Sequence, residues 1–415
     1  MSLAWLIIGG GIHGVHIGAR LIDTGVIAKE QLRILDPAPD LLMRWRDCTS
    51  RVGMKYLRSP SVHQLGNDPL ALQRFAGSRK NRKPGRFAAP YNRPDLALFN
   101  AHNEHVVQRS GLRSLHSRGR AETCLIGSDG VTVKSDTGQV WVAERVVLAL
   151  GMGDQLTWPS WAPQNTSSIQ HIFQPDCDLE TEVSRSVAVV GGGISAAQVA
   201  LRLAKQGCQV QLILRHPLRE HQFDSDPGWL GPKHMASFER EPSMERRRVM
   251  ITNARHRGSV PPDVHRALST AFAQGTVIRH EANVETLQRE QDSLVLHLSN
   301  GVQVSVDRVL LATGFAPQRP GGPMLDRLIH EACLPCAPCG YPIVDAALRW
   351  HPRIHVTGPL AELELGPTAR NIAGAQRAAD RILASLAPSD SSRYGQLSGD
   401  TANGGFSAPQ PIPRP

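Results

Sequence analysis

Two glycine-rich stretches of the sequence have the spacing that lets a backbone bind a pyrophosphate. Near the start, Gly9, Gly11 and Gly14 follow the apolar run AWLII in the order GxGxxG. The first glycine of such a turn permits a tight bend, the second lets the backbone approach a pyrophosphate, and the third allows a helix to pack closely on the strand. The helix presents unpaired N–H groups to the phosphates. Residues 4–36 therefore predict a dinucleotide site, and a purely structural turn is the alternative.

The residue that ends this unit indicates which nucleotide it accepts. The strand LRILD ends at Asp36, 22 residues beyond Gly14. A carboxylate at this point accepts hydrogen bonds from the diol of an unphosphorylated adenosine ribose. We predict that the turn binds the adenosine half of FAD, with Gly10 and His13 beside the cofactor.

A second copy of the motif differs from the first at two places. Gly191, Gly193 and Ala196 give the order GxGxxA, in which alanine is still small enough for close helix packing. The next strand, QVQLILR, ends in Arg215 instead of an acid. A guanidinium cannot accept from a ribose diol, but it pairs bidentately with a 2′-phosphate. We expect NADPH at this turn, and two different dinucleotides imply hydride transfer between them; an FAD protein with a vestigial second fold is the alternative.

The elements that would position the two turns also repeat along the chain. Short strands end in RVVLALG after the first turn, and SLVLHLSNGVQVSVDRVLLATGF repeats this design after the second. The strand PRIHVTG and a helix at 368–386 follow, and the N-terminus of that helix would aim its positive dipole at a reduced flavin. The other cofactor-binding residues that we predict are Ser195, Thr313, Gly314 and Gly358.

This order of elements predicts an α/β protein with two Rossmann-like dinucleotide-binding domains, the NADPH domain being inserted in the FAD domain. We expect the FAD domain at 1–165 and 316–386, and the NADPH domain at 180–315. After Leu386 the chain turns to serine, glycine and proline, which predicts a disordered tail at 387–415.

Composition narrows the classes of partner. The 415 residues carry a formal charge of +9, but the arginines are scattered and form no basic block with interleaved aromatics, so we expect no nucleic-acid partner. No apolar run approaches the roughly 18 residues of a membrane span, and LAWLIIGGG is short and lacks a basic leader. We therefore expect a cytoplasmic protein without membrane contact that acts on a small molecule, and the sequence is compatible with a homo-oligomer.

Three of the seven cysteines are regularly spaced. Cys333, Cys336 and Cys339 lie in CLPCAPC, a spacing found in some zinc and iron–sulfur sites. A closed metal site needs a fourth ligand that the sequence does not indicate, and the two prolines favour an ordinary loop of thiols. We predict no bound metal, and a redox disulfide stays an alternative.

The order of the motifs resembles class B flavin-dependent monooxygenases, in particular the N-hydroxylating branch that acts on amino groups of lysine, ornithine and small amines. The resemblance covers most of the first 386 residues. DRVLLATGF, residues 307–315, is similar to that family's signature of an aspartate, apolar residues, ATG and an aromatic. LLMRWRDCTSRVGMKYLRSP, residues 41–60, is similar to its segment with a tryptophan and a methionine–lysine pair beside the flavin.

The resemblance implies roles for particular residues. Trp45 would cover the flavin ring system, and the catalytic candidates Lys55, His63 and Gln64 would lie near its reacting face. FDSDPGWLGPKHMASF stands where the N-hydroxylases carry a substrate-side segment, but it is not the same motif. The resemblance therefore leaves the substrate open.

The resemblance also implies a two-stage oxidoreductase reaction. NADPH reduces FAD, the reduced flavin adds O2 to form a C4a-hydroperoxide, and the distal oxygen passes to an amine nitrogen or a sulfur of a small molecule. Most of this chemistry belongs to the cofactor, while the protein supplies orientation and a dry site. Two alternatives are a flavin disulfide or sulfide oxidoreductase that uses the three regularly spaced cysteines, and a non-catalytic sensor that binds flavin and NADPH.

Overall fold

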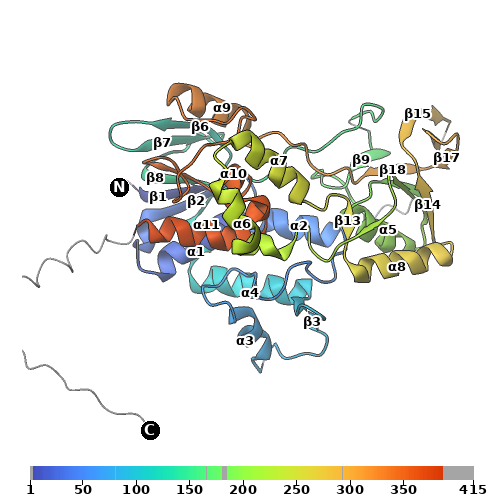
Figure 1. The fold of residues 1–415 in the computed structure, drawn as a ribbon, viewed down its shortest axis with the longest axis horizontal. Coiled ribbons are helices and arrows are strands. Elements are labelled where there is room, and N and C mark those ends of the chain that lie inside the picture. Colours follow the sequence, from blue (N-terminus) through green and yellow to red (C-terminus); the bar gives the residue numbers. More distant parts are fainter. Residues whose placement is uncertain (1–2, 80, 165, 180–184, 292, 387–415) are drawn as a thin grey trace, which may run out of the picture.

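The computed structural model describes residues 3–79, 81–164, 166–179, 185–291 and 293–386. The predicted tail at 387–415 and the predicted start of the NADPH domain at 180 lie outside the described residues. Two sheets lie side by side along the long axis of the molecule, with helices on their faces (Figure 1). In the described part of the chain, no helix has both the length and the apolar character to cross a membrane.

The first sheet has the strand order β19-β20-β8-β1-β2-β5. At its centre, β1 pairs in parallel with β2 on one side and with β8 on the other. Because β1 is buried on both faces, its sequence is an unbroken apolar run. The strands of this sheet are β1 (Leu3–Ile8), β2 (Leu32–Asp36), β5 (His116–Arg118), β6 (Ala121–Ile126), β7 (Val131–Ser135), β8 (Val140–Leu148), β19 (Arg349–His351) and β20 (Ile354–Val356).

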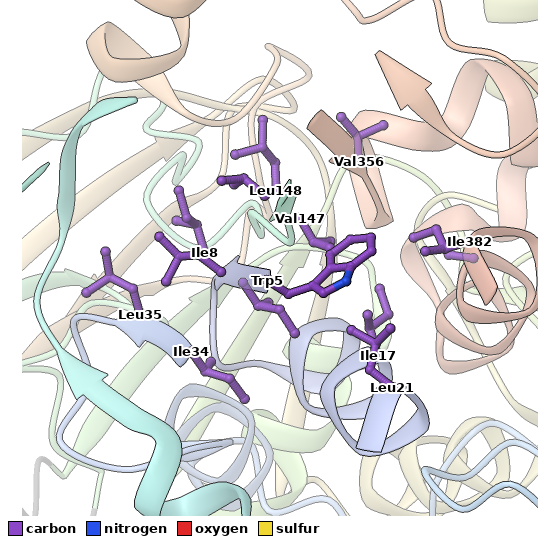
Figure 2. Packing of buried hydrophobic residues seen from close by; sticks show 14 of the residues in the cluster. Trp5, Ile8, Ile17, Leu21, Ile34, Leu35, Val147, Leu148, Val356 and Ile382 are labelled. Carbon is purple, nitrogen blue, oxygen red and sulfur yellow. The ribbon is translucent and has the colours of Figure 1, made fainter. Parts of the chain in front are cut away.

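Two helices from opposite ends of the chain cover this sheet. Trp5 of β1 is buried among Ile17 and Leu21 of α1 and Ile382 of α11, as Figure 2 shows. The predicted helix at 368–386 is shorter than expected, because a single turn at Pro367–Arg370 (η5) precedes it. The helices of this unit are α1 (Ile12–Asp23), α2 (Met43–Arg51), α3 (Ala71–Gly77), α4 (Leu96–Arg109), α9 (Gly322–Glu331), α10 (Glu362–Leu365) and α11 (Ile372–Ala384), and a small hairpin joins β3 (Phe87–Ala88) to β4 (Arg93–Pro94).

The second sheet is parallel throughout and has the order β14-β11-β10-β18-β9. It includes β9, which lies before residue 180, where we predict the NADPH domain to begin. Its elements are β9 (Ile169–His171), β10 (Ser186–Val190), β11 (Gln209–Leu214), β14 (Val277–Glu281) and β18 (Arg308–Leu311), with the helices α5 (Ile194–Lys205) and α8 (Pro262–Ala273) and the antiparallel meander β15 (Val284–Glu290), β16 (Ser293–Leu298) and β17 (Gln303–Val306).

A third group of elements joins the two sheets. It consists of β12 (Arg219–Glu220), α6 (Pro232–Arg240), α7 (Met244–Ala254) and β13 (Ser259–Val260). The helices α6 and α7 lie within the predicted NADPH domain, yet they pack on the first unit, because Phe238 and Ile251 share a buried cluster with Tyr341 and Leu363. In Figure 1 they lie beside α10 and α11. The predicted α/β fold with two Rossmann-like units is confirmed.

Candidate functional site

The first glycine-rich turn lies against other backbone segments at Gly9 and Gly14 and is open at Gly11. Gly9 has a φ of +116°, and a Cβ there would lie 2.4 Å from the carbonyl oxygen of Ala149. A Cβ at Gly14 would lie 1.8 Å from the carbonyl oxygen of Gly9, so α1 packs directly on the turn. At Gly11, by contrast, no described atom lies within 4 Å of such a Cβ. This is the shape that a pyrophosphate cradle needs.

The carboxylate of Asp36 binds the backbone of the turn and can still accept hydrogen bonds from a ligand. Its Oδ2 accepts a hydrogen bond from the amide of Gly10 at 2.6 Å, and its Oδ1 accepts one from the amide of Ala38 at 2.8 Å. An ionised carboxylate oxygen accepts a second hydrogen bond. The carboxylate therefore fits the hydroxyls of an adenosine ribose while it closes the turn.

His13 connects the first turn with two segments from the far end of the sequence. Its Nδ1 lies 2.8 Å from Oγ1 of Thr357, and its ring lies 3.7 Å from the position of a Cβ at Gly358. Burial lowers the pKa of His13 to about 4, against the opposing effect of the backbone of Arg370 and Asn371 at the start of α11. The imidazole is therefore neutral near pH 7, between the turn, the end of β20 and the start of α11.

Trp45 lies beside the two helix starts that flank the first turn. Its Nε1 donates to Oδ1 of Asn100 at 3.0 Å, and its ring centre lies 5.4 Å from that of Phe99. The apolar cluster that it joins contains Ile12, the first residue of α1, and Ile372, the first residue of α11. A large aromatic side chain thus borders the region where the sequence places the flavin.

The three catalytic candidates differ in their surroundings. Lys55 is exposed, and the side-chain amide of Gln64 is bonded to backbone atoms of its own loop. His63 faces a charged group from a distant segment, since burial lowers its pKa while the carboxylate of Asp224 opposes this shift. Of the three, His63 therefore has the surroundings expected of a titrating site residue.

The second turn repeats the construction of the first. Gly191 has a φ of +150°, and a Cβ there would lie 2.4 Å from the carbonyl oxygen of Ala312, as at Gly9. Ala196 is a buried residue in the first turn of α5, and Ser195 precedes it in the same turn. The backbone of this turn is therefore formed for a second dinucleotide.

The charge at the end of the following strand differs from that of the first turn. Arg215 follows β11 directly and is exposed. Within the ranges that the structure describes, its guanidinium forms no ion pair or hydrogen bond. An unpaired guanidinium at this position fits a phosphorylated ribose. Two further predicted contacts lie after β18: Thr313 donates its hydroxyl to the carbonyl oxygen of Thr157, and Gly314 has a φ of +80°.

A buried carboxylate with three arginines fixes the inserted helices to the first unit. Glu362 has no exposed surface, and it accepts hydrogen bonds from Arg370 at 2.8 and 2.9 Å, from Arg255 at 2.8 Å, and from Arg248. Burial alone would raise the pKa of Glu362, but the three guanidinium groups lower it to about 2. Since Arg370 adjoins α11, this cluster sets where the start of α11 lies relative to α7.

Arg58 makes a second connection of this kind. Its guanidinium donates to the carbonyl oxygens of residues 221–223 and to Oγ of Ser259, at 2.7 to 2.8 Å. The next residue, Asp224, accepts from Nδ2 of Asn371 at 3.2 Å. Residues 221–224 are thereby held between the segment after α2 and the start of α11.

Sequence reasoning missed both connections. The signal for Glu362 was an acid inside the largely apolar run GPLAELELGP, which calls for buried cationic partners. For Arg58 there was no signal, since a single arginine before SPSVH has nothing in its neighbourhood that indicates burial.

The three regularly spaced cysteines lie in the chain between α9 and β19. All seven cysteines are free thiols, and Cys333 and Cys339 are exposed. Among the residues covered by the structure, no group of three or more His, Cys, Asp or Glu is arranged to hold a metal ion. The nearest atoms to the glycines of the first turn belong to Ala149, Asp36, Leu41 and other non-cysteine residues.

Comparison with known proteins gives two family matches and many similar folds. Residues 104–380 match the family model for pyridine nucleotide-disulphide oxidoreductases, and residues 6–153 match one described as FAD-NAD(P)-binding. No curated protein matches the chain.

Solved structures match over nearly the whole chain at low identity. The ornithine N-hydroxylase of Kutzneria sp. 744 is 15% identical, with 93% of this chain and 99% of that chain covered and a TM-score of 0.72. The reduced ornithine hydroxylase of Pseudomonas aeruginosa is 17% identical, with 93% of this chain and 99% of that chain covered and a TM-score of 0.73. The bacillithiol disulfide reductase of Bacillus cereus is 17% identical, with the same shares of the two chains covered, 93% and 99%, and a TM-score of 0.61. These likenesses confirm, at the level of the fold, the resemblance that we infer from the motifs.

The family matches bear directly on the predicted class of protein. The FAD-NAD(P)-binding match spans the first glycine turn and Asp36, and the longer match spans the second turn and reaches into α11. The prediction of an oxidoreductase with flavin- and nicotinamide-nucleotide-binding units is therefore confirmed. The longer match, residues 104–380, covers more than half of the 415-residue chain, so the chain belongs to the pyridine nucleotide-disulphide oxidoreductase family.

Proposed function

We propose that the chain is an FAD-dependent, NADPH-consuming monooxygenase that oxygenates a nucleophilic heteroatom, an amine nitrogen or a sulfur, of a small molecule in the cytoplasm. The observation that carries this proposal is the difference between the two turns. At the first turn a carboxylate, Asp36, ends the following strand, whereas at the second turn an unpaired guanidinium, Arg215, comes directly after the following strand. One turn suits the unphosphorylated ribose of FAD and the other the phosphorylated ribose of NADPH.

The chain's own residues would hold and orient the two cofactors. FAD, when bound, supplies the redox and oxygen chemistry. The first turn and the N-terminus of α1 bind its pyrophosphate, and Asp36 accepts from its ribose. The N-terminus of α11 stabilises negative charge that develops on the ring system. Trp45 and the apolar cluster around it exclude water on one side.

The fold comparison favours oxygenation over disulfide reduction. The two ornithine hydroxylases reach TM-scores of 0.72 and 0.73, whereas the bacillithiol disulfide reductase reaches 0.61. A disulfide reductase of this architecture needs a thiol beside the flavin. The neighbours of His13 and of the first glycines include Thr357, Gly358, Arg370, Ala149, Asp36 and Leu41, and none of these is a cysteine.

Rapid mixing with oxygen tests the proposed reaction. The protein is reduced with NADPH without oxygen and then mixed with oxygenated buffer while the absorption spectrum is followed. We expect a transient band that belongs to neither the reduced nor the oxidised flavin. Direct return of the oxidised spectrum, with the oxygen recovered as peroxide, would contradict the proposal.

Thiol titration separates the disulfide alternative, which the family name and the cysteine spacing of 333–339 support. Free thiols are counted before and after reduction by NADPH. We expect the same count in both samples. Two additional thiols after reduction would instead support a disulfide oxidoreductase, and the absence of sustained NADPH turnover with any amine or thiol would favour a sensor.

A further inference from the structure

Although the arginines are scattered over the chain as a whole, one stretch on the surface concentrates positive charge. Residues 69–94 contain seven lysines and arginines and neither aspartate nor glutamate. Among the residues that the structure describes, Arg79, Arg82 and Lys83 are exposed and form no ion pair. Three other cations of the stretch are paired with acids from outside it, namely Arg74 with Asp68, Arg86 with Asp95 and Arg93 with Asp263. The stretch therefore carries positive charge that no described acid neutralises.

Two of the unpaired cations line a pocket. It lies between α3 and the loop that leads into β3, and Arg82, Lys83 and Arg86 contribute to its walls together with the apolar Ala76 and Phe87. In Figure 1, α3 and β3 lie below α4. The volume of about 350 Å³ is near the lower end of the range of small-molecule sites, which is about 300 to 1,000 Å³. The pocket shares no lining residue with either glycine-rich turn, and a small ligand would fill it.

Arg86 has hydrogen-bond donors left in this pocket. Its side chain is 17% exposed, and its Nη1 donates to the two carboxylate oxygens of Asp95 at 3.2 and 3.3 Å. Asp95 is itself fixed, because it caps α4 and accepts from the amide of Leu98 at 2.6 Å. Within the described ranges, Nη2 of Arg86 makes no hydrogen bond. Arg86 can therefore orient an oxyanion, while Arg82 and Lys83 supply the net charge.

Hydrogen bonds hold both walls of the pocket in place. On the side of α3, Nε2 of Gln73 donates to Oγ of Ser61 at 2.9 Å. On the side of the loop, the hydroxyl of Tyr56 donates to the carbonyl oxygen of Gly85 at 2.9 Å. Phe87 packs against the apolar cluster that also contains Trp45. The pocket is thus formed before a ligand arrives, so that binding does not have to order its backbone.

We propose that this pocket binds a small molecule that carries two or more oxyanion groups, as a diphosphate or a polycarboxylate does. Arg82 and Lys83 neutralise the charge of the ligand, and Arg86 hydrogen-bonds one of its oxyanions. A ligand with a single negative charge would leave one of the two unpaired cations without a partner. The inference goes beyond the proposed function and does not rest on it, because the pocket is separate from both dinucleotide turns.

Calorimetric titration with three probes tests the ligand class. The protein is loaded with FAD and kept in excess NADP+, so that the glycine-rich turns are occupied, and is titrated with pyrophosphate, citrate and orthophosphate. We expect pyrophosphate or citrate to bind at one site per chain and at least about tenfold more tightly than orthophosphate. The tighter of the two shows whether the ligand is a phosphate or a carboxylate. Three probes that all fail to bind at millimolar concentration would contradict the proposal.

Three variants test the location of the site. Arg82→Ala and Lys83→Ala are each expected to weaken the tighter probe by about tenfold. Arg79→Ala removes an exposed, unpaired cation of the same stretch that is not among the residues of the pocket wall, so it is the matched control and should change the affinity by less than about twofold. The thermal midpoint of each variant shows that its fold is intact.

The outcomes separate a built site from diffuse surface charge. Equal weakening by all three variants, or sedimentation with phosphatidylserine vesicles that all three variants reduce alike, would show an extended cationic surface and overturn the pocket. Unchanged probe affinity in Arg82→Ala and Lys83→Ala would also overturn it. If NADPH still reduces the flavin in these variants, the proposed function stands whether or not the pocket binds its probe.

Discussion

Replacing Glu362 with alanine is expected to lower the free energy of unfolding by about 3–5 kcal/mol, because it leaves three buried or half-buried guanidinium groups without their shared carboxylate. Equilibrium unfolding in urea measures this difference. The matched control is Glu331→Ala on α9, whose carboxylate pairs with Arg327 at 2.7 Å on the surface. The control should cost less than about 0.5 kcal/mol. Equal unfolding curves for the two variants would show that the Glu362 cluster does not hold α7 on the first unit.

The same cluster gives the stability a defined dependence on pH. The pKa of Glu362 falls from its ordinary value of 4.5 to about 2 in the folded protein. A lowered carboxyl pKa stabilises the folded state fully above pH 4.5, and this contribution is lost as the pH falls from 4.5 through 2. The stability difference between the wild type and Glu362→Ala should therefore shrink in that window. A difference that stays constant down to pH 2 would contradict the assigned role.

Replacing Gly14 with valine is expected to weaken FAD binding by at least about a hundredfold. A Cβ at this position would lie 1.8 Å from the carbonyl oxygen of Gly9, so α1 must move away and carry its N-terminal amides from the phosphates. The flavin content of the purified protein and a titration of the apoprotein with FAD measure the effect.

A glycine in open space serves as the control for this substitution. Gly77 ends α3, and no described atom lies within 4 Å of a Cβ placed there. Gly77→Val should keep its FAD. If Gly14→Val also bound FAD with unchanged affinity, the first turn would not be the flavin site.

The features that the sequence predicted best are those encoded by neighbouring residues. The strand, the glycine turn and the helix of each unit lie within about 30 residues, and their spacing follows from how a tight turn meets a helix. Asp36 and Arg215 were found in the same way, because Asp36 ends the strand that follows its turn and Arg215 comes directly after the corresponding strand. The acceptor role of Asp36 toward Gly10 is also local in space, since the strand ends beside the turn.

The features that the sequence could not give depend on contacts between distant residues. Glu362 meets Arg248 and Arg255, which lie 114 and 107 residues away, and Arg58 meets His221 at a separation of 163 residues. No local pattern specifies such partners. The short strand β9 was not predicted for a different reason: in three residues, apolar and polar side chains cannot alternate often enough to indicate a strand.

The helices α6 and α7 show a further limit. An amphipathic pattern indicates that a helix buries one face, but it does not indicate which surface covers that face. Residues 232–254 stand between strands of the second sheet in the sequence, yet their apolar side chains pack against Tyr341 and Leu363 of the first unit. Residues 255–260 follow directly from α7, so the position of Gly258 beside Gly193 of the second turn was equally out of reach of the sequence.

The most direct test of the central claim, that one turn binds FAD and the other NADPH, is an anaerobic titration of the FAD-loaded protein with NADPH and, separately, with NADH. We expect NADPH to abolish the absorption band of the oxidised flavin at concentrations at which NADH has little effect, because Arg215 is an unpaired cation at the second ribose position. A protein that takes up no FAD, or a bound flavin that NADPH leaves oxidised, would contradict the account.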